Sequence, residues 1–294
     1  MEKIGRLITA MVTPFKPDGS INYAKAEELA SYFADNGCDG LVVHGTTGES
    51  PTLTHEEEYE LYKVVKSAAK GRLSVIAGTG SNSTATTIAS TQKAEKLGLD
   101  AALLVVPYYN KPSQEGLYQH YKAVAQSSGL PLILYNIPGR TGINMLPETI
   151  ARISELKNVI GLKDAAGDLN QTSAVRQLTS DKFLIWSGDD SLTLPMMSVG
   201  AYGVISVASH IVCGQIKEMI SSFVEGRTKE AEALHRKLMP VFKVLFITSN
   251  PSPVKYALSL VGCDCGKTRL PLVEPLDREK EQIQKVMKEL GIIQ

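Results

Sequence analysis

Short apolar runs recur along the chain at intervals of roughly 25 to 35 residues, and amphipathic stretches lie between them. The runs are apolar without strict alternation, which indicates strands that are buried on both faces. Eight candidate strands follow from this pattern: Leu7–Val12, Gly40–His44, Ser74–Gly78, Ala101–Val106, Leu132–Asn136, Val159–Lys163, Phe183–Ser187 and Gly203–Ser206.

The segments between these runs have the apolar spacing of helices, as in Tyr23–Asn36, Glu56–Lys70 and Thr84–Leu97. Thr54 followed by Glu57 predicts a capping box at the start of the second of these helices. Repeated strand–helix units favour an α/β fold, a closed (β/α)8 TIM barrel, over an open doubly wound sheet with a second domain. The open sheet is disfavoured because no Gly-x-Gly-x-x-Gly sequence follows the first strand.

The chain continues beyond the eighth strand with more helical sequence than the last helix of a barrel needs, including Thr228–Leu238 and Arg278–Leu290. We therefore predict a barrel domain over residues 1–224 and a C-terminal helical extension over residues 225–294. The segment Asn250–Pro253 contains two prolines, and we expect it to interrupt the helices of the extension, because proline has no backbone N–H to donate.

The charge of the chain excludes some classes of partner. Among its 294 residues are 31 basic and 31 acidic ones, which gives a formal net charge of zero. No long block of like charge is present, so we expect neither nucleic acid nor a membrane surface as a partner. The chain also lacks the long apolar run of a membrane helix and the pattern of a secretion signal, so we expect a cytoplasmic protein.

Cysteine and histidine spacing gives no indication of a metal site. Cys38, Cys213, Cys263 and Cys265 do not form paired knuckles, and the five histidines lie far from them in the sequence. We expect four reduced thiols and no bound metal ion.

Lys163 stands at the end of an apolar run, Val159–Lys163. Burial of an unpaired ammonium is costly, and loss of the proton usually relieves the cost. A neutral lysine amine can attack a ketone and form an imine. The commoner alternative for a lysine at a strand end is a head group that reaches into water. The other residues expected near Lys163 are therefore needed to distinguish a catalytic lysine from a solvated one.

In a barrel, catalytic groups lie at the carboxyl ends of the strands. After the second strand, Thr46 and Thr47 stand between two glycines. This loop could bind a carboxylate or could be an ordinary turn; a phosphate is less favoured, because no lysine follows as in a P-loop. Tyr135 ends the fifth strand and could transfer protons or simply pack in the core. Arg140 could bind a carboxylate or form a surface ion pair, and Tyr109 could join a relay or a subunit interface.

Taken together, these motifs resemble the dihydrodipicolinate synthase (4-hydroxy-tetrahydrodipicolinate synthase) family, pyruvate-dependent enzymes of the class I aldolase superfamily. The matching segments are Gly45–Ser50, Pro107–Pro112, Tyr135–Gly142, Gly161–Lys163, Ser187–Asp190, Gly203–Ser206 and Asn250–Lys255. The resemblance implies a barrel with C-terminal helices that assembles as a homotetramer of tight dimers. It implies a lyase that condenses pyruvate with L-aspartate 4-semialdehyde on the route to lysine and diaminopimelate. No cofactor is implied, because the imine itself is the electron sink.

The resemblance also assigns catalytic roles by motif. Lys163 would form the imine with pyruvate. Tyr135, Thr46 and Tyr109 would form a proton relay, with Tyr109 reaching in from the neighbouring subunit.

The substrate-binding residues that the resemblance implies come from four different loops and strands. Thr47 would bind the carboxylate of pyruvate, and Arg140 the carboxylate of the semialdehyde. Gly188 and the backbone of Ile205 would lie near bound pyruvate.

The sequence departs from the family pattern beside the lysine. The family commonly has Glu where Asp164 stands and a hydroxyl residue where Ala166 stands, which would alter contacts around the site. The lysine-inhibition site of some members is also matched only in part, so we expect weak or absent inhibition by lysine. Its matching positions are Ser50, His55, Asn82 and Tyr108, and the differing ones are Pro51, Glu58 and Thr86.

Two other functions compete with the synthase. An N-acetylneuraminate lyase or a 2-keto-3-deoxy sugar-acid aldolase would share the lysine and the tyrosine, but a sugar polyol would not need Arg140. A non-catalytic barrel that binds a keto acid is the second alternative, because the fold alone does not establish catalysis. The presence of the nucleophile, the relay and the carboxylate loop together argues against it.

Overall fold

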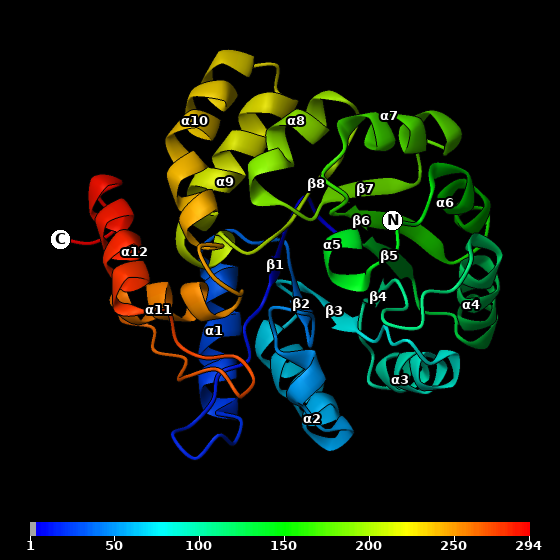
Figure 1. Cartoon of the computed structure of the whole chain (residues 1–294), viewed down its shortest axis with the longest axis horizontal. Coiled ribbons are helices and arrows are strands. Elements are labelled where there is room, and N and C mark those ends of the chain that lie inside the picture. The colour runs from blue at the N-terminus through cyan, green and yellow to red at the C-terminus, as the bar shows by residue number, and fades with distance from the viewer. Residues whose placement is uncertain (1–3) are drawn as a thin grey trace. The chain divides into compact units, whose positions relative to one another are not determined.

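The computed structural model describes residues 4–294, and its eight parallel strands close into a barrel in the order β1 to β8 (Figure 1). The strands are β1 (Leu7–Ala10), β2 (Gly40–Val43), β3 (Ser74–Gly78), β4 (Ala101–Val105), β5 (Leu132–Asn136), β6 (Val159–Asp164), β7 (Leu184–Ser187) and β8 (Gly203–Ser206). The predicted (β/α)8 class is therefore confirmed, and only some strand ends shift.

Nearly all strand residues are buried, as their continuous apolar runs predicted. Parallel pairing aligns residues at the carboxyl ends of neighbouring strands. In the β5–β6 pair, Tyr135 lies opposite Lys163 and Asn136 lies opposite Asp164. The register thus brings two predicted site residues together.

Helices follow the strands along the chain. They are α1 (Tyr23–Asp35), α2 (His55–Ala69), α3 (Thr84–Lys96), α4 (Gln114–Ser127), α5 (Pro138–Thr141), α6 (Pro147–Ser154), α7 (Leu169–Leu178), α8 (Thr193–Ser198), α9 (Ser209–Val224), α10 (Thr228–Val244), α11 (Ser252–Leu260) and α12 (Asp277–Glu289), with 3-10 turns η1 (Ser50–Thr52) and η2 (Asp190–Leu192). The predicted capping box of α2 is present. The N–H of Glu57 donates to the Thr54 hydroxyl at 3.2 Å, and the N–H of Thr54 donates to the Glu57 carboxylate at 3.0 Å.

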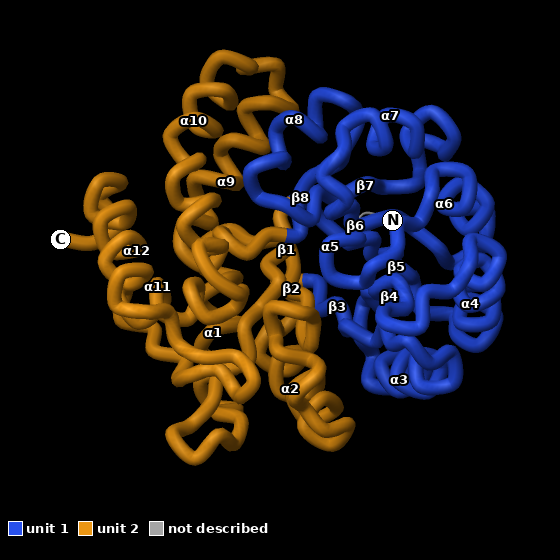
Figure 2. Tube along the Cα trace, viewed as in Figure 1, with its two compact units in different colours: residues 1–6, 74–205 blue, residues 7–73, 206–294 orange. Residues whose placement is uncertain are grey.

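The contacts within the chain define two compact units (Figure 2). Unit 1 comprises residues 1–6 and 74–205, and unit 2 comprises residues 7–73 and 206–294. Unit 1 carries β3 to β7 and most of β8, whereas unit 2 carries β1, β2 and the C-terminal helices. The predicted domain boundary after residue 224 lies inside unit 2, between α9 and α10, and it stays a prediction.

In unit 2, α9 packs against α10, and α11 packs against α12. The predicted interruption of the extension is confirmed, because α10 ends at Val244 and α11 begins at Ser252. Pro253 occupies the first turn of α11, where the missing N–H has no partner to lose. Among residues 4–294, no helix is both long and apolar enough to cross a membrane.

Candidate active site

Lys163 is buried in β6 of unit 1, with only 6% of its surface exposed. Burial lowers the pKa of its ammonium from 10.5 to about 8; the charge of Asp190 opposes this shift and the charge of Arg140 adds to it. With such a pKa, about a tenth of the amine is neutral at pH 7, against roughly one part in three thousand for an ordinary lysine. The alternative in which Lys163 reaches into water is therefore wrong.

Tyr135 lies beside this amine. The Lys163 Nζ is 4.3 Å from the centroid of the Tyr135 ring, and the tyrosine is itself buried. This contact follows from the register of β5 and β6, in which the two residues are direct partners. A nucleophilic amine and a phenol that can exchange protons are thus adjacent in one dry environment.

Gly188 follows β7, and its lack of a side chain leaves room for Ala165 and for the side chain of Lys163. A Cβ at Gly188 would lie 2.7 Å from the Cβ of Ala165 and 3.2 Å from the Cε of Lys163. The Gly188 N–H donates to the carbonyl of Asp164 at 2.7 Å, which fixes the loop against β6. Gly188 therefore lies beside the stem of Lys163, and its predicted place near bound pyruvate stays a prediction. Ile205 is buried in β8.

Asp190 ends the matching segment Ser187–Asp190, but no role of its own was predicted for it from the sequence. Its side chain is buried, and its charge acts on Lys163, whereas the Asp189 carboxylate accepts the N–H of Ser191 at 2.8 Å. The two consecutive carboxylates thus act on different groups: Asp189 caps the turn η2, whereas Asp190 lies within it. The available signal was the position of Asp190 just after a buried strand.

An amide network that is partly buried supports the segment after β5, in which the short helix α5 carries Arg140. The Asn136 Nδ2 donates to the Asn144 Oδ1 at 2.8 Å, and the Asn144 Nδ2 donates to the Gln171 Oε1 at 2.6 Å. The Thr141 hydroxyl donates to the carbonyl of Ile143 at 2.9 Å. Arg140 is exposed on the supported short helix α5, so its guanidinium can meet an incoming anion.

The loop with Thr46 and Thr47 belongs to unit 2. Thr47 is buried and its Oγ1 accepts a hydrogen bond of 2.9 Å from the Asn250 Nδ2, whereas Thr46 is half-buried. The N–H groups of Gly48 and Glu49 donate within the loop, to Gly45 and Thr46, at 3.0 and 3.1 Å. An anion bound in this loop would therefore have to use the N–H and hydroxyl groups of the two threonines.

Tyr109 lies in the loop after β4 and is 90% exposed, with a left-handed backbone at φ 73°. A non-glycine residue at such a φ is uncommon and indicates a conformation that its surroundings impose. The structure does not place Tyr109 against another predicted site residue of unit 1 within residues 4–294. Its predicted role in a neighbouring subunit stays a prediction.

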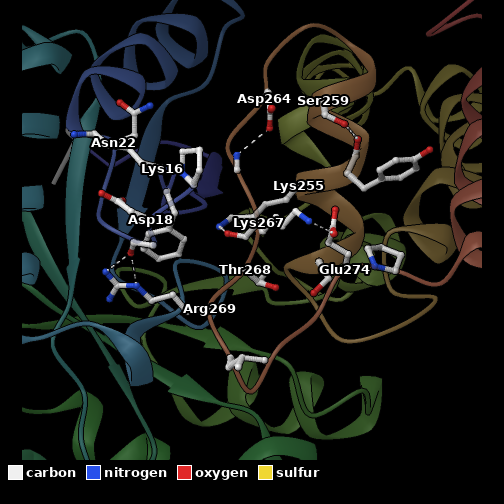
Figure 3. A pocket seen from close by; sticks show the side chains of 18 residues that line it. Lys16, Asp18, Asn22, Lys255, Ser259, Asp264, Lys267, Thr268, Arg269 and Glu274 are labelled. Carbon is white, nitrogen blue, oxygen red and sulfur yellow. Dashed lines mark hydrogen bonds and ion pairs between the residues drawn. The ribbon is translucent and has the colours of Figure 1, made fainter.

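Unit 2 also contains a pocket of about 950 Å³, lined by segments within 15–22 and 252–275 (Figure 3). Two of the charged side chains that line it have partners within unit 2: the buried Lys255 pairs with Glu49, and the half-buried Arg269 pairs with Glu57. We interpret this pocket as structural. Among residues 4–294, no group of three or more His, Cys, Asp or Glu side chains is placed to hold a metal ion.

The chain matches known proteins along nearly its whole length. The model of the dihydrodipicolinate synthetase family matches residues 3–290. A 4-hydroxy-tetrahydrodipicolinate synthase of Cyanothece sp. is 54% identical over 294 residues, covering 100% of both chains. A protein of the same name from Desulforamulus reducens is 55% identical over 290 residues, with 98% of each chain covered.

Solved structures agree with these matches. The crystal structure of DHDPS from Cyanidioschyzon merolae with lysine bound has a TM-score of 0.98 at 49% identity and covers 100% of both chains. A monomeric dihydrodipicolinate synthase variant has a TM-score of 0.96 at 42% identity, covering 99% of this chain and 98% of the variant.

The barrel and the dry lysine beside a tyrosine are the features of a class I aldolase, a lyase that acts through a lysine imine. Within that class, the chain belongs to the dihydrodipicolinate synthetase family. This membership confirms the family, the enzyme class and the synthase activity that the sequence motifs implied.

The space at Gly188 provides a test of the site's shape. We expect Gly188→Ala to lower the free energy of unfolding by about 1–3 kcal/mol, because the added methyl group meets Ala165 and the carbonyl of Asp164. Denaturant unfolding measures this change. Gly139→Ala is the matched control, since nothing lies within 4 Å of its added Cβ. An equal effect of the two substitutions would contradict the packing described here.

Proposed function

We propose that this chain condenses pyruvate with L-aspartate 4-semialdehyde through an imine at Lys163, giving 4-hydroxy-tetrahydrodipicolinate. The observation that carries the proposal is the buried Lys163 amine, with its pKa lowered to about 8 by burial, next to Tyr135. Relatives that are 54% and 55% identical bear the name of this synthase, which supports the choice of reaction.

The proposed chemistry begins with attack of the neutral Lys163 amine on the keto carbon of pyruvate. Loss of water from the adduct gives a protonated imine, and loss of a proton from the methyl group gives an enamine. The enamine carbon attacks the aldehyde of the second substrate. The amino group of that substrate then displaces Lys163 from the imine carbon, which closes the ring and regenerates the free amine. The imine nitrogen accepts the electron pair throughout, so we propose that no cofactor takes part.

Tyr135, Thr46 and Tyr109 are proposed to move the protons of these steps. Tyr135 is supported by its contact with Lys163, and the two other residues by their motifs alone. We propose that the exposed Tyr109 serves a neighbouring subunit.

The substrate carboxylates are assigned to different residues. We propose that Thr47 binds the carboxylate of pyruvate and Arg140 that of the semialdehyde, while Gly188 and the backbone of Ile205 line the pyruvate site. The amide network under the Arg140 loop supports this role, because a fixed loop binds an anion with a smaller loss of entropy.

We propose that this chain assembles as a homotetramer of tight dimers. One of the solved relatives is a variant that is described as monomeric. We also propose a cytoplasmic location and weak or absent inhibition by lysine.

Reductive trapping tests the function directly. Incubation with pyruvate and sodium borohydride should add one reduced pyruvate to the chain, and peptide mapping should place it on Lys163. Lys163→Ala should abolish the adduct, whereas Lys157→Ala, which changes an exposed lysine nearby in the sequence, should leave it intact. An unmodified Lys163 in an active enzyme would overturn the proposal. So would faster turnover with a sugar aldehyde than with L-aspartate 4-semialdehyde.

Arg140 tests the assignment of the second substrate. Arg140→Ala should raise the KM for L-aspartate 4-semialdehyde by about 10- to 100-fold, the value of a lost charged hydrogen-bond pair. Pyruvate should still be trapped, because the imine forms before the semialdehyde binds. Steady-state kinetics measure the first effect and mass spectrometry the second. The control is Arg152→Ala, since Arg152 pairs with Glu115 on the surface. Loss of trapping in Arg140→Ala would show that its assigned role is wrong.

A further inference from the structure

Asn250 joins the start of α11 to the loop after β2. Its Nδ2 donates to the Thr47 Oγ1 at 2.9 Å, and the two side chains are only 5% and 4% exposed. The residues are 203 positions apart in the chain, and both belong to unit 2. Such a bond is protected from water, so it constrains both partners.

The direction of this bond determines what the Thr47 hydroxyl can do. An amide nitrogen only donates, so the Thr47 oxygen accepts there, and its single proton points to a different acceptor. In residues 4–294 the structure shows no acceptor for that proton. A buried threonine hydroxyl held in this way is prepared to donate to an anion.

We propose that Asn250 is a positioning residue, which holds the Thr47 hydroxyl as a donor to the carboxylate of the 2-oxo acid. This inference rests on the proposed function of Thr47. Asn250 acts through Thr47, and its effect falls on the binding of pyruvate rather than on the chemistry at Lys163.

The segment that carries Asn250 is firmly anchored to the same loop. Lys255 in α11 forms a buried ion pair of 2.7 Å with Glu49, which follows the Thr47 loop. The N–H of Arg269 donates to the other oxygen of Glu49 at 2.8 Å. Glu49 has a left-handed backbone at φ 58°, a conformation that needs support from its surroundings.

The Arg269 guanidinium extends this anchor. It donates to the carbonyl of Gly19 at 2.8 and 2.9 Å, and it pairs with Glu57 at 2.5 Å. Arg269 is one of the residues that line the pocket (Figure 3). A buried ion pair that loses one partner is strongly destabilised, so Lys255 and Glu49 are expected to stay together. Lys255 in α11 and Arg269 thus both hold Glu49, which lies two residues after Thr47, and these contacts fix Asn250 relative to Thr47.

A double-mutant cycle tests the proposal. The measured quantity is the pyruvate concentration that gives half-maximal borohydride-trapped adduct on the full chain, by intact mass. Asn250→Ala should raise this concentration by about tenfold, and the trapping rate at saturating pyruvate should change by less than about twofold. In a Thr47→Val background, Asn250→Ala should cause no further loss, because the hydroxyl that it positions is gone.

The controls separate positioning from folding. Asn36→Ala changes an exposed asparagine of unit 2, whose Nδ2 donates to the carbonyl of Tyr32 at 2.8 Å, and should leave half-saturation unchanged. If Asn250→Ala does not fold, Asn250→Ser removes the same bond with a smaller change in volume, and the same loss is expected.

The outcomes distinguish this inference from the function on which it rests. Unchanged or improved pyruvate binding in Asn250→Ala, or losses that add in the double variant, would overturn the inference alone. Failure of the unmodified chain to trap pyruvate would overturn the proposed function together with it.

Discussion

Removal of water from the ammonium of Lys163 is the constraint on which the rest of the site depends. β6 carries this lysine inward among apolar strand residues, and its pKa falls to about 8 because burial disfavours the charge. Asp190 opposes the fall and Arg140 reinforces it, so the charge balance around one nitrogen determines how much nucleophile is present. An ammonium whose charge was fully balanced by nearby carboxylates would keep its proton, and it would then have no free electron pair to attack a ketone.

The parallel barrel supplies the geometry for this chemistry. Neighbouring strands end together, so Tyr135 and Lys163 meet as direct partners of the β5–β6 ladder. The loops beyond the strands need separate support, because loops are otherwise mobile. Side-chain amides give that support: Asn136 bonds to Asn144 in the segment that carries Arg140, and Asn250 bonds to Thr47. Strands thus position the nucleophile, whereas polar networks position the groups assigned to the carboxylates.

The barrel could be predicted from sequence because each of its strands is a local apolar run. The positions of Lys163 and Tyr135 at strand ends could be predicted for the same reason, since each is a polar residue near the end of such a run. The bonds of Asn250 with Thr47 and of Lys255 with Glu49 could not be predicted in this way. Each joins residues that are far apart in the chain, and no spacing rule links them. The effect of Asp190 on Lys163 was not predicted for a related reason, since it depends on the fold and not on the neighbours of Asp190 in sequence. The role of Tyr109 cannot be read from a single chain. Its ring is exposed there, and its predicted place is in the site of another subunit.

The most direct test of the central claim is the pH dependence of imine formation at Lys163. The rate of borohydride-trapped pyruvate adduct at low pyruvate should be measured from pH 6 to pH 11, with the adduct assigned by peptide mass. Only the neutral amine attacks, so the rate should rise about tenfold per pH unit at low pH and level off above pH 8, with an inflection near the pKa of about 8. A rate that continues to rise up to an inflection near 10.5, the ordinary pKa of a lysine, would contradict the account.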